Sequence, residues 1–209
     1  MATLDVLTAA EALAAVNGVS ATDAAELATY TTALSLALDG WCGPIVERTI
    51  TGERVNGGRH DMYLRHWPIS AVASISDYGT ACTEETDATA PPAEGYILTP
   101  HGTQAGLYGP EIVRRSEGID YVWYRGRGTV VVTYTAGRFA STATVDERFK
   151  AAARIMLQNA WRSEQHSVSQ FDEYTVPHQS FPKFAFPNAA RHLLSGEIQN
   201  DPERSVVVT

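Results

Sequence analysis

Apolar residues recur at helical spacing in the segment 145–161, where polar residues separate them. The residues that would share one face of an α-helix are Val145, Phe149, Ala152, Met156 and Ala160. Residues 129–135, just upstream, are β-branched and aromatic without interruption, a composition that favours a largely buried strand. A β-rich region is therefore predicted to lead directly into a long amphipathic helix.

Two further helices are predicted before residue 43. Thr8 and Glu11 have the spacing of a capping box, which starts a short helix ending near Val16, and residues 20–23 repeat this start signal. The apolar stripe of the second helix comprises Leu27, Tyr30, Leu34, Leu38 and Trp41. Its opposite side carries Thr29, Thr32 and Ser35 among alanines. That face suits either packing against a neighbouring subunit or a second buried face within the chain.

Between the helices, shorter apolar runs and period-two alternation predict strands. They are expected at 45–55, 62–65, 72–75, 96–99, 119–124 and 129–135. Glycine-containing turns at 56–58 and 125–128 predict hairpins that join the strands on either side. We expect residues 80–94 to form an exposed acidic loop and residues 101–110 to form a mobile loop tip.

This order of elements predicts an α+β fold in which an antiparallel β lobe is inserted into a helical bundle. The expected parts are a helical lobe at 1–43 and 144–163, a β lobe at 44–143, and an extended C-terminal tail at 164–209. The tail should contain a short helix near 188–195, because Pro187 suits the first helical position. Its apolar end, 205–209, could add a strand to a partner's sheet or pair with the chain's own sheet.

Composition and charge narrow the class of protein. The formal net charge is −8 and the pI is near 5.2, which argues against tight binding to phosphate backbones. No apolar run is long enough to span a bilayer, and the N-terminus lacks a signal-peptide pattern, so we expect no membrane association and no secretion. Cys42 and Cys82 are far apart in the sequence and are expected to be free thiols.

The sequence contains no recognisable catalytic, cofactor or metal motif. The six histidines form no HxxxH or HExxH pair, and there is no nucleophile elbow and no phosphate-binding loop. Arg114, Arg115, Arg125 and Arg127 are expected to form local ion pairs. The prediction is therefore a protein without enzymatic activity and without cofactors.

Several motifs nevertheless occur in a characteristic order. A helix ending in 41–43 precedes a Leu64-x-x-x-Pro68-Ile69 motif, and a Val-x-Tyr-x-Ala-Gly motif at 132–137 precedes the alanine-rich helix that ends at Trp161. In this order, over roughly three quarters of its length, the chain resembles the head-to-tail connector (adaptor) proteins of long-tailed bacteriophages, in the longer form with a β insertion. It departs from that pattern by extra residues after Gly196.

The resemblance implies a structural protein of the virion neck, made in the host bacterial cytoplasm. Family members form a ring, commonly of twelve subunits, beneath the portal protein. The ring extends the DNA channel, through which DNA passes without specific binding, and docks the next neck protein, the stopper. No catalytic, cofactor or metal residues are implied.

On this basis three surfaces are assigned as hypotheses. The tail would bind the portal through Phe181, Phe184, Phe186, Arg191, Leu193, Leu194, Val206, Val207 and Val208. A loop of the β lobe would contact the next ring through His101, Gln104, Leu107 and Tyr108. Thr29, Thr32 and Ser35 would pack subunits together.

Three alternatives remain open from the sequence. The chain could be another neck or tail-completion protein such as the stopper, although long helices flank the predicted sheet. It could be a small enzyme with a dispersed site drawn from Asp61, His66 and Arg114. It could also be a bacterial interaction module of prophage origin.

Overall fold

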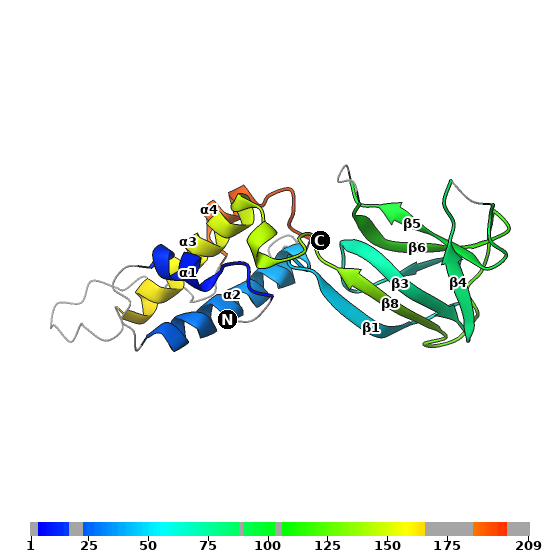
Figure 1. Ribbon diagram of the computed structural model, residues 1–209, viewed down its shortest axis with the longest axis horizontal. Coiled ribbons are helices and arrows are strands. Elements are labelled where there is room, and N and C mark those ends of the chain that lie inside the picture. Colours follow the sequence, from blue (N-terminus) through cyan, green and yellow to red (C-terminus); the bar gives the residue numbers. More distant parts are fainter. Residues whose placement is uncertain (1–3, 17–22, 88–89, 103–105, 166–185, 200–209) are drawn as a thin grey trace, which may run out of the picture. The chain divides into compact units, whose positions relative to one another are not determined.

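The computed structural model forms two compact units, which we describe separately (Figure 1). The residues it describes are 4–16, 23–87, 90–102, 106–165 and 186–199. A helical unit combines the described parts of Met1–Val46 and Phe139–Thr209, and a β unit comprises Glu47–Arg138. The fold is thus α+β, as predicted.

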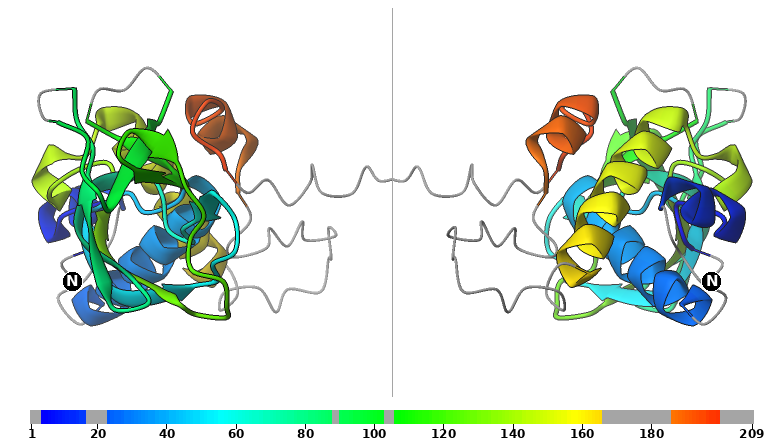
Figure 2. Two further views of the ribbon diagram at one scale, coloured as in Figure 1. Left: turned by 90° about the vertical axis from the view of Figure 1, so that its right-hand side faces the viewer. Right: turned by 90° about the vertical axis from the view of Figure 1, so that its left-hand side faces the viewer.

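The helical unit is built on two long antiparallel helices, α2 (Ala24–Cys42) and α3 (Glu147–Gln165), which lie side by side (Figures 1 and 2). Two short helices, α1 (Ala9–Ala15) and α4 (Asn188–Leu193), both pack against α3. A single 3₁₀ turn, η1 (Thr142–Thr144), precedes α3. Helix α3 is therefore the element that the other three helices share.

The predicted N-terminal capping box is confirmed. The Glu11 N–H donates to Thr8 Oγ1 at 3.3 Å, and the Thr8 N–H donates to Glu11 Oε2 at 2.8 Å. The second start signal is only partly described, since Ser20 lies outside the described residues. Asp23 is the N-cap of α2, but its side chain makes no capping hydrogen bond.

The core of the helical unit follows the predicted apolar stripes. All five residues predicted for one helical face are buried, and Val145, Phe149, Ala152 and Met156 belong to the same apolar cluster as Leu27, Leu34 and Leu38 of α2. Each large apolar side chain buried in this way contributes about 1.5–3 kcal/mol relative to an exposed one. The spacing of apolar residues therefore identified the helix interface correctly.

The β unit is one strongly curved sheet. Its strands are β1 (Arg48–Val55), β2 (Asp61–Tyr63), β3 (Ile69–Asp77), β4 (Thr80–Glu84), β5 (Gly95–Pro100), β6 (Tyr108–Ser116), β7 (Ile119–Asp120) and β8 (Val130–Ala136). The order is β1-β8-β3-β4-β5-β6-β2, with β7 added to β6. An additional pairing of β3 with β6, at Ile69 and Tyr108, closes the sheet into a barrel-like form.

The interior of the β unit has its own apolar core. It includes Ile75, Ile112, Trp123, Val132 and Tyr134, all of which are fully or almost fully buried. Along β8 the residues alternate between buried and half-buried, so one face of the strand lines this core. The Tyr134 hydroxyl at the core's edge donates to Glu53 Oε2 at 2.6 Å.

The predicted hairpin at 56–58 is wrong. Strand β1 pairs with β8, and β2 pairs with β6, so the two strands flanking this turn are not neighbours. Residues 56–58 instead pack against a distant connection, where the Gly57 N–H donates to Gly126 O at 3.0 Å. A Cβ atom on Gly57 would lie 2.0 Å from Tyr124 O, so this close approach requires glycine.

The predicted hairpin between 119–124 and 129–135 is also wrong. Strand β7 is only two residues long and pairs with β6, while Tyr121–Tyr124 forms no strand. Trp123 in this segment is fully buried, and its backbone N–H donates to Arg59 O. The first part of the predicted acidic loop 80–94 is a strand instead, because residues 80–84 form β4 and pair with β3.

Candidate assembly surfaces

The described part of the C-terminal tail belongs to the helical unit. Ala190 and Leu194 are fully buried against it, and the Phe186 ring stacks on Trp41 with centroids 4.2 Å apart. The Gln199 N–H donates to Trp41 O at 2.8 Å. Residues 186–199 therefore contribute to the stability of the unit.

Because of this packing, only some of the nine residues predicted to bind the portal are accessible to a partner. Phe181, Phe184, Val206, Val207 and Val208 lie outside the described residues. Leu194 is buried and Phe186 is half-buried against Trp41, so both are used within the chain. Arg191 is half-buried and Leu193 is 39% exposed, which leaves Leu193 as the accessible large apolar side chain of α4.

The loop predicted to contact the next ring closes on itself at its described ends. The His101 N–H donates to Leu107 O at 2.9 Å, and the His101 ring packs edge-on against Trp67. Leu107 is buried, Tyr108 is half-buried at the start of β6, and Gln104 lies outside the described residues. The loop is therefore anchored to the β unit on both sides.

The three residues predicted for subunit packing differ in exposure. Ser35 is 4% exposed and accepts a hydrogen bond from the Val6 N–H, so it faces the interior of the helical unit. The half-buried Thr32 hydroxyl donates to Asp5 Oδ2 at 3.2 Å. Thr29 is exposed, and Leu36, on the same side of α2, is 58% exposed. Thr29 and Leu36 thus lie on the solvent face of this helix, which also carries the exposed Glu26 in the first turn.

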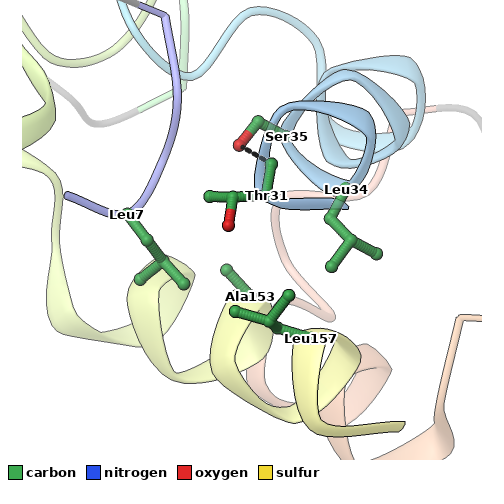
Figure 3. Close-up of a pocket in the computed structure, with 6 residues that line it drawn as sticks. All are labelled: Leu7, Thr31, Leu34, Ser35, Ala153 and Leu157. Carbon is green, nitrogen blue, oxygen red and sulfur yellow. Dashed lines mark hydrogen bonds between the residues drawn. The ribbon is translucent and has the colours of Figure 1, made fainter. Parts of the chain in front are cut away.

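A small hollow lies between the N-terminal segment, α2 and α3 (Figure 3). It leaves no room for a water molecule, and its lining residues are Leu7, Thr31, Leu34, Ser35, Ala153 and Leu157. The Thr31 hydroxyl donates to Leu27 O and the Ser35 hydroxyl donates to Thr31 O, both at 2.8 Å. Because neither hydroxyl proton is free to bind a ligand, we interpret the hollow as a gap in helix packing.

The strongest electrostatic feature of the β unit is a buried arginine. Arg114 is 2% exposed, and its Nε lies 3.2 Å from Asp77 Oδ2, a carboxylate that is also buried. Its guanidinium also contacts Glu94 and donates to Gly95 O. Burial disfavours its charge, but the hydrogen bond with Glu94 and the nearby charges outweigh this effect and raise the pKa of Arg114.

This arrangement argues against the dispersed enzyme site. The Arg114 guanidinium is committed to Asp77 and Glu94 rather than to Asp61 or His66. Neither cysteine forms a disulfide and both are buried, and burial raises the pKa of the Cys82 thiol, which makes it a poor nucleophile. Over the described ranges of the chain, no three His, Cys, Asp or Glu side chains lie close enough to hold a metal ion.

A further surface was missed by the sequence analysis. Tyr78, Tyr121 and Tyr124 are 65%, 56% and 52% exposed, and the rings of Tyr78 and Tyr124 stack with centroids 4.1 Å apart. Tyr78 follows β3, whereas the other two lie in the connection between β7 and β8. The available sequence signal was the aromatic segment 121–124, which was interpreted as a strand.

None of the described helices is long and apolar enough to cross a membrane.

Comparison with known proteins gives a likeness of fold. No family model and no curated protein matches the chain. A chain from the neck of an empty gene transfer agent (GTA) particle, computed with C6 symmetry, has a TM-score of 0.50 at 15% identity, covering 94% of this chain and 92% of that chain. A chain from the neck of a native GTA particle, computed with C12 symmetry, has a TM-score of 0.48 at 14% identity, covering 92% and 94%. The likeness at a TM-score of 0.50 shows a shared fold.

Proposed function

We propose that this protein is a structural component of the neck of a phage-like particle, and specifically the adaptor that forms a ring beneath the portal. The observation that carries the proposal is the fold that it shares, over 94% of its length, with a chain from the neck of an empty GTA particle. The order of sequence motifs, which resembles that of phage adaptors, supports the same assignment independently.

The proposed assembly is a ring, of twelve copies by the family resemblance, in which DNA passes through a central channel. The C6 symmetry of the particle neck containing the similar chain supports a cyclic arrangement. The net charge of −8 suits a channel wall, because like charge keeps the duplex from adhering. The weakly charged face of α2 with Thr29 and Leu36 suits packing between neighbours.

The tail and the loop at 101–110 keep their proposed partners, the portal and the stopper respectively. Because residues 186–199 are part of the helical unit, portal binding is assigned to the flanking segments and to the exposed Leu193. Deleting everything after residue 180 would remove buried Leu194 and so destabilise the fold. A deletion of 200–209 keeps Leu194 and is therefore the better test of portal binding.

The test is a pull-down of the chain by its cognate portal ring. We expect a variant lacking 200–209, combined with Phe181→Ser and Phe184→Ser, to lose portal binding while keeping the thermal unfolding temperature of the parent. Ile119→Ser, which alters a residue 72% exposed on β7, is the matched control and should bind normally. Undiminished binding by the tail variant would refute the tail assignment.

A second candidate is the stopper, and one observation favours it. The pairing of β3 with β6 gives the sheet a barrel-like closure, and stoppers are generally built on a β-barrel. The four helices of the other unit favour the adaptor. A chain that binds the assembled connector ring, but not the bare portal, would support the stopper instead.

A further inference from the structure

Three connections meet at one edge of the β unit. The end of β1 and the end of β3 both pair with the start of β8, at Val55 and Asp77 opposite Val130. The turn after β3, the residues after β1 and the connection 121–129 are therefore neighbours (Figure 1). The side chains that these connections and the end of β1 present to solvent include Arg54, Tyr78, Tyr121, Tyr124, Arg125 and Arg127, which we call the Tyr–Arg patch.

Hydrogen bonds of the backbone hold the tyrosines of the patch in place. The Tyr78 N–H donates to Thr129 O at 3.0 Å, and the Tyr124 N–H donates to Asp77 Oδ1 at 3.0 Å. Asp77 is itself fixed by the buried Arg114. Tyr78 has a φ of 49°, an uncommon conformation for a residue other than glycine, which surrounding contacts must maintain. The stacked tyrosines are therefore preorganised before any partner arrives.

The three arginines of the patch carry unneutralised charge. Arg125 lies against Gly58, and Arg54 donates to Gly128 O at 3.2 Å. Arg54, Arg125 and Arg127 form no ion pair with any carboxylate in the described part of the chain, in contrast to the sequence prediction for Arg125 and Arg127. The whole chain has a formal charge of −8, so the residues other than these three arginines carry −11.

This combination fits a protein partner better than a nucleic acid. Rigid tyrosines on loops supply a large contact area at a low cost in conformational entropy, as in antibody combining sites. Tyrosine and arginine are also the side chains most enriched at the energetic centres of protein interfaces. The acidic remainder of the chain would repel a DNA duplex. The partner surface should therefore be a protein surface rich in carboxylates.

We propose that the Tyr–Arg patch docks on an acidic surface of a second copy of this chain, the adjacent subunit of the ring. Charge complementarity carries the choice of partner, because the chain outside the three arginines is strongly acidic. The contact is heterologous, since the patch meets a different surface of its neighbour, as ring closure requires. This inference rests on the proposed ring-forming function.

Site-specific photo-crosslinking tests the occupant directly. A photoreactive benzoylphenylalanine replaces Tyr124 in one variant and Tyr121 in another. A third variant carries it at Tyr63, a residue 55% exposed on β2, as the matched control. Each variant is bound to the cognate portal ring and irradiated, and the crosslinked peptides are identified by mass spectrometry.

The expected result is a product of twice the 22.7 kDa chain mass for the two patch variants, with the captured peptide coming from an acidic segment of this chain. The control at Tyr63 should give at least about tenfold less of this product. Capture of a portal peptide, or no capture at either patch position, would overturn the inference while leaving the proposed function intact. Failure of all variants and of the parent chain to bind the portal would overturn both.

Charge reversal separates a specific contact from chance proximity. The substitutions Arg125→Glu and Arg127→Glu are combined with the photoreactive group at position 124. They should lower the yield of the double-mass product about tenfold or more, because like charges then face each other. Both arginines are exposed, so the unfolding temperature should not change. An unchanged yield of the double-mass product would contradict the proposal. It would also be contradicted if the parent chain bound a 20-base-pair DNA duplex and the two substitutions abolished that binding.

Discussion

Replacing Arg114 with methionine tests the buried ion pair on which one end of the β unit depends. Methionine keeps the aliphatic length of the side chain but removes the guanidinium from Asp77, Glu94 and Gly95 O. Asp77 would then be a buried carboxylate without a countercharge. Its remaining hydrogen bond from the Tyr124 N–H satisfies one oxygen only.

The expected loss in the free energy of unfolding follows from these contacts. Removing one partner of a buried ion pair costs about 3–5 kcal/mol, because the other charge is left unpaired in a medium of low polarity. Glu94 is about half exposed, so its contact adds little to this cost. Since Asp77 keeps one hydrogen bond, we expect a loss near the lower end, about 3 kcal/mol, in the free energy of unfolding.

The assay is urea denaturation followed by circular dichroism, with hydrogen exchange read separately for peptides of each unit. Exchange should accelerate in β3 and β6 and stay unchanged in α2 and α3. Arg115→Met is the matched control: the neighbouring side chain points to the other face of β6 and is more exposed, so it should have a clearly smaller effect.

Adding Asp77→Asn to Arg114→Met should recover part of the lost stability, because the orphaned charge is removed. A loss below about 1 kcal/mol for Arg114→Met alone would refute the reasoning, since it would mean that water reaches the pair.

Three other predictions concern the helical unit and the thiols. Burial opposes ionisation of Glu11, but hydrogen bonds from Lys150 and Thr8 lower its pKa to about 2. The stability from this ionised carboxylate is therefore present above pH 4.5 and lost as the pH falls toward 2, and Glu11→Gln should flatten the dependence of unfolding temperature on pH in that window. Leu194→Ala should cost about 2–5 kcal/mol by leaving a cavity under α4, measured by urea denaturation, whereas Leu193→Ala should cost much less. The two buried cysteines should react with a thiol reagent only as fast as the chain unfolds; rapid labelling of the native protein would contradict their burial.

The sequence predicted the helical unit well because its signals are local. The face of α3 could be predicted because burial on one side of a helix leaves a regular spacing, and Thr8 and Glu11 form their capping box within one turn. The position of α4 after Pro187 was predicted for the same reason. Its packing on α3 was not, because no local pattern encodes a tertiary contact.

Strand pairing in the β unit could not be predicted in this way. Asn56-Gly57-Gly58 predicted a hairpin that does not form, because the partner of β1 is decided by side chains far along the chain, as in the pairing of Val55 with Val130. Arg114 and Arg115 face opposite sides of β6, but no strand was predicted over 108–116, so the sequence did not separate the two arginines. The stacking of Tyr78 on Tyr124 joins residues distant in sequence and leaves no local pattern.

The most direct test of the central claim is the mass of the assembled complex. The purified chain should be a monomer of 22.7 kDa in native mass spectrometry, and addition of the cognate portal ring should give a complex heavier by many copies of that mass. Twelve added copies would match the proposed ring. A portal ring whose mass is unchanged in the presence of excess chain would contradict the assignment as an adaptor.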